Sequence, residues 1–131
     1  MISEEIEVVF SKEDVQQFVQ ILGDPNPIYQ SIEGAKSSGL PTIPLPPAMP
    51  AITYKWITAP WELKPPVIHR KQECRIEQPM FIDQKYKAVV TLDRNDVRGE
   101  NTFVQQSLKI FDLEGKLYFQ GISHLIAGGV K

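Results

Sequence analysis

Residues 23–29 read GDPNPIY and place an acid, an amide, two prolines and a tyrosine in one short segment. The preceding residues predict an amphipathic helix, because Ser11 is a good N-cap and apolar residues follow it with i, i+3, i+4, i+7 spacing. These apolar residues are Val15, Phe18, Val19 and Leu22. Gly23 supplies the C-terminal stop of this helix, so Asp24 is expected just beyond its end.

Two further helices are expected after this loop. Residues 31–38 read as a short helix that Gly39 ends. The proline-rich stretch LPTIPLPPAMP, residues 40–50, favours extended backbone. Pro47 can be the first residue of a helix, where its missing N–H costs nothing, and residues 51–56 can continue it. This helix would be largely apolar and therefore largely buried.

The second half of the sequence has the period of β-strands. Tyr86, Ala88, Val90 and Leu92 alternate with residues that point the other way, as in a half-buried strand. Strands are expected at 67–77, 85–92, 104–110 and 117–127, with turns at 95–101 and 112–116. The order predicts a single α+β domain over residues 1–131, with helices on one face of an antiparallel sheet.

Composition excludes several classes of function. The net charge is -2 and no stretch is strongly basic, so nucleic-acid binding is not expected. No apolar run approaches the ~20 residues of a membrane span. Cys74 is the single cysteine, expected to be a buried, inert thiol, and no Cys/His cluster has metal-ligand spacing. His69 and His124 are expected to be structural. The acidic N-terminus has no signal-peptide pattern, which favours the cytoplasm.

The order of these segments resembles the MaoC-like hot-dog family, which includes R-specific enoyl-CoA hydratases. The resemblance rests on GDPNPIY, on AKSSGL at residues 35–40, on LPPAMP at residues 45–50 and on GKLYFQGISHLIA at residues 115–127. It covers nearly the whole chain. It implies an antiparallel sheet wrapped around a long central helix, an acyl-thioester substrate and no cofactor.

Position 29 departs from the hydratase pattern. Hydratases of this family carry G-D-x-N-P-x-H, which Gly23, Asp24, Asn26 and Pro27 match, but Tyr29 stands where the histidine is expected. A tyrosine here resembles the N-terminal, dehydratase-like branch. Proteins of that branch form one half of a double hot dog, or act as the substrate-binding subunit beside a catalytic hot-dog partner.

The resemblance makes Asp24 and Tyr29 the candidate catalytic residues. Hydration of an enoyl thioester requires a base for the attacking water and an acid for Cα, which an Asp–His pair can supply. A phenol has an ordinary pKa of ~10, so it is a poor base at neutral pH, although it can donate a hydrogen bond. The alternative is that Asp24 and Asn26 only cap the turn, since both side chains readily bond nearby backbone N–H groups.

Asn26, Ala48 and Met49 are the candidate substrate-binding residues. If Pro47 begins the central helix, the backbone N–H groups of Ala48 and Met49 can hold a thioester carbonyl oxygen. The alternative is that they merely begin a buried helix. Met49 can also line an acyl tunnel, as can Trp56 and Trp61, or all three can belong to the core.

The function expected from the resemblance is acyl-thioester handling, with acyl-CoA as ligand, in fatty acid metabolism. The chain would be the substrate-binding subunit of a 3-hydroxyacyl-thioester dehydratase or enoyl-CoA hydratase, a lyase, with impaired or no activity alone. The alternatives are a self-sufficient hydratase using Asp24 and a non-catalytic acyl-CoA binding or scaffold protein. A thioesterase shares the fold, but residues 48–56 carry no acid or histidine. An open sheet edge predicts a homodimer, or a heterodimer with a catalytic hot-dog subunit.

Overall fold

A five-stranded antiparallel sheet in the order β1-β4-β5-β6-β3 is the largest element of the computed structural model, which describes residues 1–131. A two-stranded sheet, β2-β7, lies at one end of it. The strands are β1 (Ile6–Val9), β2 (Leu63–Lys64), β3 (Ile68–Ile76), β4 (Lys85–Arg98), β5 (Asn101–Asp112), β6 (Leu117–Ala127) and β7 (Gly129–Val130). The expected α+β class is confirmed.

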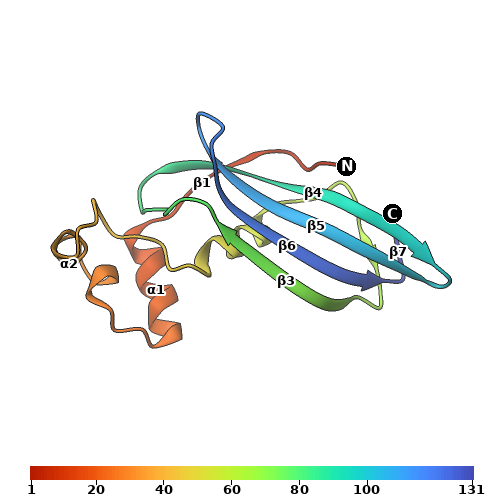
Figure 1. The fold of residues 1–131 in the computed structure, drawn as a ribbon, viewed down its shortest axis with the longest axis horizontal. Coiled ribbons are helices and arrows are strands. Elements are labelled where there is room, and N and C mark those ends of the chain that lie inside the picture. The colour runs from red at the N-terminus through yellow and green to blue at the C-terminus, as the bar shows by residue number, and fades with distance from the viewer.

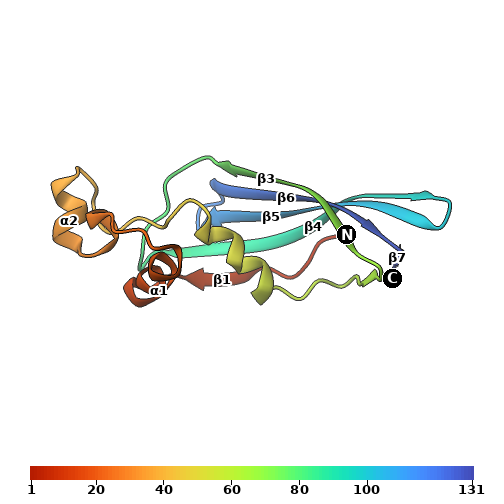
Figure 2. The ribbon, with the colours of Figure 1, turned by 90° about the horizontal axis from the view of Figure 1, so that it is seen from below.

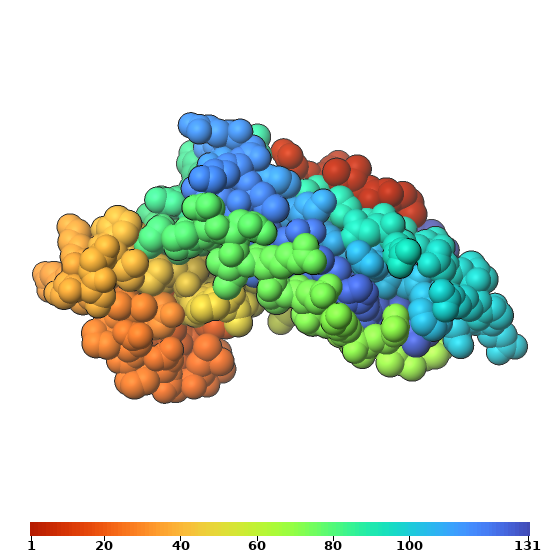
Figure 3. Space-filling model, in the orientation of Figure 1, coloured from red at the N-terminus to blue at the C-terminus, as the bar shows by residue number.

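The helices lie on one side of this sheet and beyond one end. The 3₁₀ helix η2 (Met49–Trp56) packs against what we call the inner face, while α1 (Lys12–Leu22), η1 (Pro27–Tyr29) and α2 (Ile32–Ser37) form a lobe at the end (Figures 1 and 2). No helix covers the outer face, which the space-filling view shows open (Figure 3). None of the helices has the length and hydrophobicity that a membrane-spanning helix requires.

Side-chain alternation along the strands directs the core to the inner face. On β5, the residues Val104, Gln106, Leu108 and Ile110 are all buried, whereas their neighbours in the sequence are mostly half-buried. A main core of 18 buried residues includes side chains from the sheet, from η2 and from the lobe. The sheet and the lobe therefore share one apolar interior.

The signals at the helix ends are local, and the structure confirms them. Ser11 caps α1, accepting a hydrogen bond from the Asp14 N–H while the Asp14 carboxylate accepts one from the Ser11 N–H. Gly23 ends α1 in the left-handed conformation, at φ 70°. Ser31 caps α2 through the N–H of Gly34.

The central helix is shorter than the long helix that the resemblance implies. It begins at Met49 with Ala48 as N-cap, and it spans eight residues of 3₁₀ geometry before Ile57 becomes extended. Runs of 3₁₀ helix are short because side chains three residues apart eclipse one another. The β-branched Ile52 and Thr53 also lower helix propensity at this position.

Two expectations in the second half of the chain need correction. Residues 95–101 were expected to form a turn, but β4 continues to Arg98 and β5 begins at Asn101, because Asp96 pairs with Phe103 across the hairpin. Only residues 99–100 connect these strands. Cys74 was expected to be buried and is exposed, because β3 is an edge strand with little packed against it.

Candidate functional site

The loop at residues 23–29 is fixed by its own side chains. Oδ1 of Asp24 accepts a hydrogen bond from the Asn26 N–H at 3.0 Å, and Oδ1 of Asn26 accepts one from the Ile28 N–H at 3.2 Å. The second bond caps η1, whose first residue is Pro27. These are the hydrogen bonds expected if Asp24 and Asn26 cap the turn. Each of them uses one side-chain oxygen. The second oxygen of the half-buried Asp24 carboxylate makes no hydrogen bond within the chain.

Tyr29 points into the core rather than into solvent. Its side chain is 7% exposed and belongs to the main core. Burial raises the pKa of the Tyr29 phenol, and the nearby Asp24 carboxylate raises this pKa further. Both effects favour the neutral phenol, so Tyr29 cannot act as a base near neutral pH.

Asp24 lies at the rim of an open depression between α1 and the loop. The depression has a volume of about 480 Å³, and Gln16 crosses it to donate a hydrogen bond to the Gln30 carbonyl. Its lining consists of Gln16, Val19, Gln20, Gly23, Asp24, Pro25 and Gln30. Asp24 therefore faces an open depression formed by residues of α1 and of the loop.

The start of η2 lies beside a different and smaller pocket, of about 150 Å³, lined by Pro47, Pro50 and residues of the proline-rich stretch and of β3. Met49 is buried, and its N–H donates to the Pro46 carbonyl at 3.0 Å. Ala48 is exposed, and no backbone carbonyl accepts its N–H. Of these two donors, only Ala48 is free to bind a carbonyl oxygen. The convergence of Asp24, Asn26 and Tyr29 with this helix start on one cleft stays a prediction.

A third pocket lies between η2 and the inner face of the sheet, and it opens toward the edge strand β3. Its volume is about 360 Å³. The lining residues are Ala51, Tyr54, Lys55, His69, Gln72, Gln106, Leu108, Gly121, Ser123 and Leu125. We call it the inner pocket. No acid lines it.

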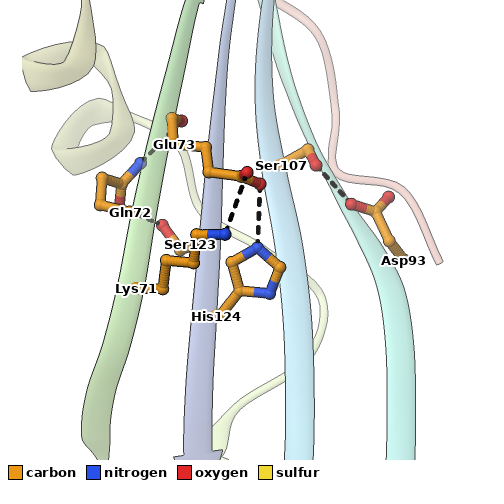
Figure 4. Close-up of polar contacts among 7 residues, drawn as sticks. All are labelled: Lys71, Gln72, Glu73, Asp93, Ser107, Ser123 and His124. Atoms are coloured by element: carbon orange, nitrogen blue, oxygen red, sulfur yellow. Dashed lines mark hydrogen bonds and ion pairs between the residues drawn. The ribbon is translucent and has the colours of Figure 1, made fainter.

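Hydrogen bonds fix the polar groups of the inner pocket. Gln106 accepts a hydrogen bond from the Trp61 indole at 2.9 Å and donates one to the Tyr54 hydroxyl. Ser123 donates to Oε1 of Gln72 at 2.7 Å, which joins β6 to β3 (Figure 4). Burial raises the pKa of Tyr54 to about 12, and the Asp93 carboxylate contributes to this shift. Since several of its polar groups bond to one another, the pocket presents mainly apolar surface, with Lys55 as its one lysine.

The residues of the inner pocket were not predicted from the sequence. Tyr54 and Gln106 are 52 positions apart, and the packing of η2 against β5 brings them together. The one signal in the sequence was the position of Gln106 on the same strand face as Val104 and Leu108, where an apolar residue is expected. The two tryptophans do not line this pocket: Trp61 is buried behind Gln106, and the half-exposed Trp56 packs on Phe10.

Comparison with known proteins identifies relatives of the chain. The family described as FAS1-like, dehydratase domain region, matches residues 1–120. A UPF0336 protein of Saccharopolyspora erythraea is 25% identical over 126 residues, covering 90% of this chain and 80% of the relative. A UPF0336 protein of Streptomyces avermitilis is 26% identical over 125 residues, covering 88% and 82%.

Solved structures of MaoC-like hot-dog proteins have the same fold. A chain of the HadBC (3R-hydroxyacyl-ACP dehydratase) complex from Mycobacterium tuberculosis gives a TM-score of 0.82 at 16% identity, covering 97% of this chain and 95% of that chain. A chain of the ChsH1-ChsH2 complex from the same organism gives 0.76 at 15% identity, covering 96% and 83%. The (R)-hydratase of A. caviae gives 0.73 at 16% identity, covering 95% of each chain.

Proposed function

Since the chain belongs to the FAS1-like dehydratase-region family, we propose that it binds an acyl thioester as one subunit of a 3-hydroxyacyl-thioester dehydratase or enoyl-CoA hydratase. The thioester is linked to coenzyme A, and the catalytic base comes from a hot-dog partner. This assigns the protein to the lyases of fatty acid metabolism. We place it in the cytoplasm, where the exposed thiol of Cys74 would stay reduced.

The observation that carries this proposal is the state of Tyr29. Water must lose a proton as it attacks Cβ of an enoyl thioester, and Cα must gain one. A buried phenol whose pKa is raised, beside a carboxylate, keeps its proton and cannot receive the proton of water. Asp24 is then left without a titrating partner, which supports slow or absent turnover by this chain alone.

The inner pocket supports an acyl ligand. Its walls include Ala51, Leu108 and Leu125, and its amide and hydroxyl groups are mostly bonded to one another. A volume of about 360 Å³ suits a short acyl chain. Asn26 and the free N–H of Ala48 are the proposed contacts of the thioester end, reached from the side of the lobe.

The edge strand β3 supports assembly with a second hot-dog chain. It has nine residues, nearly all exposed, and its outer edge has no partner strand. Such an edge is normally covered. If the β3 strands of two identical chains pair antiparallel about Gln72, Lys71 of each chain would lie opposite Glu73 of the other. Two of the similar solved structures are described as complexes of two different proteins, which supports a heterodimer equally.

Enzyme assays test the proposal. We expect the purified protein to bind a short enoyl-CoA in calorimetry but to hydrate it very slowly or not at all. Addition of a hot-dog subunit with an intact Asp–His pair should restore turnover. Asp24→Asn should leave binding nearly unchanged and abolish any residual rate, whereas Asn26→Ala should weaken binding.

Two results would contradict the proposal. A fast wild-type rate that Asp24→Asn abolishes would favour the self-sufficient hydratase. Binding without turnover, with every hot-dog partner tested, would favour a non-catalytic acyl-CoA binding protein.

A further inference from the structure

Three arginines and one aromatic ring line a single depression on the outer face of the sheet. Arg70 comes from β3, Arg94 and Arg98 come from β4, and Phe103 comes from β5. They enclose a depression of about 230 Å³. The remaining lining residues are Asp96, Val104, Gln105 and His124. We call this the arginine cluster. It lies on the face opposite the inner pocket, because neighbouring residues such as Gln105 and Gln106 line different pockets.

Phe103 holds two of the guanidinium groups in place. The Cζ atoms of Arg70 and Arg98 lie 4.9 Å and 4.7 Å from the centroid of the ring. Cation–π contacts of this kind orient a guanidinium while leaving its N–H groups free for hydrogen bonds. The side chains of Arg70 and Arg98 are therefore already ordered in the free protein. A ligand that binds them loses less free energy to ordering these side chains.

The positive charge of the cluster is not neutralised within the chain. The ion pairs of the protein join Lys71 and His124 to Glu73, Lys85 to Glu7, and Lys87 to Glu5. None of them includes Arg70, Arg94 or Arg98. Asp96 is the only carboxylate that lines the depression, and it forms no ion pair with these arginines.

Glu73, the one carboxylate of the edge strand β3, is already occupied by other partners. Its Oε2 lies 3.1 Å from Nε2 of His124, and its Oε1 lies 3.3 Å from Nζ of Lys71 (Figure 4). These contacts lower the pKa of Glu73, with the His124 hydrogen bond the largest cause, so Glu73 is ionised at neutral pH. Its charge is shared by these two partners rather than by the arginines.

We propose that the arginine cluster binds the phosphate groups of a small phosphate ester. A guanidinium fork matches two phosphate oxygens, and three forks around one depression match the charge of a phosphate monoester or a diphosphate. The phosphorylated end of coenzyme A and a free nucleotide share this chemistry. A nucleic acid fits less well, because the net charge of the chain is -2 and the cluster is confined to one depression.

Calorimetry with ligands that carry no thioester tests this site independently of the acyl pocket. The ligands are ADP, adenosine 3′,5′-bisphosphate, inorganic phosphate and coenzyme A, with adenosine as the uncharged reference. We expect the phosphate esters to bind more tightly than adenosine, and Arg94→Gln and Arg98→Gln each to weaken them about tenfold or more. Arg75→Gln is the matched control, because Arg75 is exposed on β3 outside the depression. It should leave their affinity unchanged.

The same titrations identify the source of the phosphate. If Arg98→Gln weakens the binding of coenzyme A as much as the binding of ADP, coenzyme A is a ligand of the cluster. If ADP binds and coenzyme A does not, the ligand is a free nucleotide. The proposal is overturned if no phosphate ester binds, or if Arg75→Gln weakens binding as much as Arg98→Gln. It is also overturned if a single-stranded oligonucleotide binds more tightly than ADP.

Discussion

The indole nitrogen of Trp61 donates a hydrogen bond to Oε1 of Gln106 at 2.9 Å, between two buried side chains 45 positions apart. This bond joins the segment after η2 to the middle of β5. Gln106 then donates to the hydroxyl of Tyr54 on η2 itself. One amide therefore satisfies two polar groups of the helical layer and holds that layer against the sheet.

Replacing Gln106 should destabilise the protein much more than replacing its neighbour. Gln106→Leu keeps the size of the side chain but leaves the buried Trp61 N–H without an acceptor, at a cost of about 1–3 kcal/mol. Gln105→Leu is the control on the outer face, where Gln105 makes no side-chain hydrogen bond and the change should stay within about 0.5 kcal/mol. Urea unfolding measures both variants. Equal stability of the two would mean that the Trp61 bond contributes nothing.

The pKa of Tyr54 predicts a loss of stability at alkaline pH. Burial raises this pKa from 10.0 to about 12, so the folded protein retains the phenol proton at pH values where the unfolded chain has lost it. The stabilisation is complete below the unfolded pKa of 10.0 and is lost as the pH rises to about 12. Unfolding of the wild type and of Tyr54→Phe across this range should show a steeper decline in the wild type. Parallel curves would contradict the shift.

Gly34 should not tolerate a side chain, although it lies inside a helix. A Cβ there would lie 2.3 Å from the Pro27 carbonyl oxygen, which belongs to the backbone of η1. Gly→Ala inside a helix ordinarily stabilises by up to about 1 kcal/mol. We expect Gly34→Ala instead to destabilise, by more than about 1 kcal/mol, as the loop at residues 23–29 shifts.

Gly39→Ala serves as the control for this substitution. Gly39 has φ +84°, and no atom lies within 4 Å of the position that a Cβ would take, so only backbone strain of about 1–2 kcal/mol opposes the change. Thermal unfolding gives both stabilities, and enoyl-CoA binding reports on the loop. Gly34→Ala should reduce that binding and Gly39→Ala should not. Unchanged binding in Gly34→Ala would separate the loop from the ligand.

Cys74 reports on assembly through β3. Its thiol is exposed in the single chain, on the edge strand where a partner would pair. We expect light scattering to give a dimer at micromolar concentration, and the rate of thiol modification to fall as the protein is concentrated. A stable monomer with a constant rate would contradict assembly. A dimer whose Cys74 reacts at the monomer rate would place the interface away from β3.

The features that sequence predicted are those with local causes. Ser11, Gly23 and Ser31 determine the helix ends through neighbouring N–H and C=O groups, and alternation along residues 85–92 determines which face of β4 is buried. For the loop at residues 23–29, the turn just after α1 was predicted correctly. Its participation in a ligand site stays a prediction.

The features that sequence did not predict depend on which strands are neighbours. Cys74 is exposed only because β3 is at the edge of the sheet, and this position depends on the whole strand order. The arginine cluster is assembled from β3, β4, β5 and β6, so no single segment contains its pattern. The extended β4–β5 hairpin depends on cross-strand pairs that outweigh the polar composition of residues 95–101.

The burial of Tyr29 has an evolutionary consequence. A side chain that is 7% exposed and packed among the 18 residues of the main core contributes to stability whether or not it touches a ligand. Histidine at this position would be smaller and more polar, so it would leave a void and bury an additional polar group. Tyr29 would therefore be retained for its packing alone, even without a role at a ligand. A histidine at this position would require compensating changes in the surrounding core.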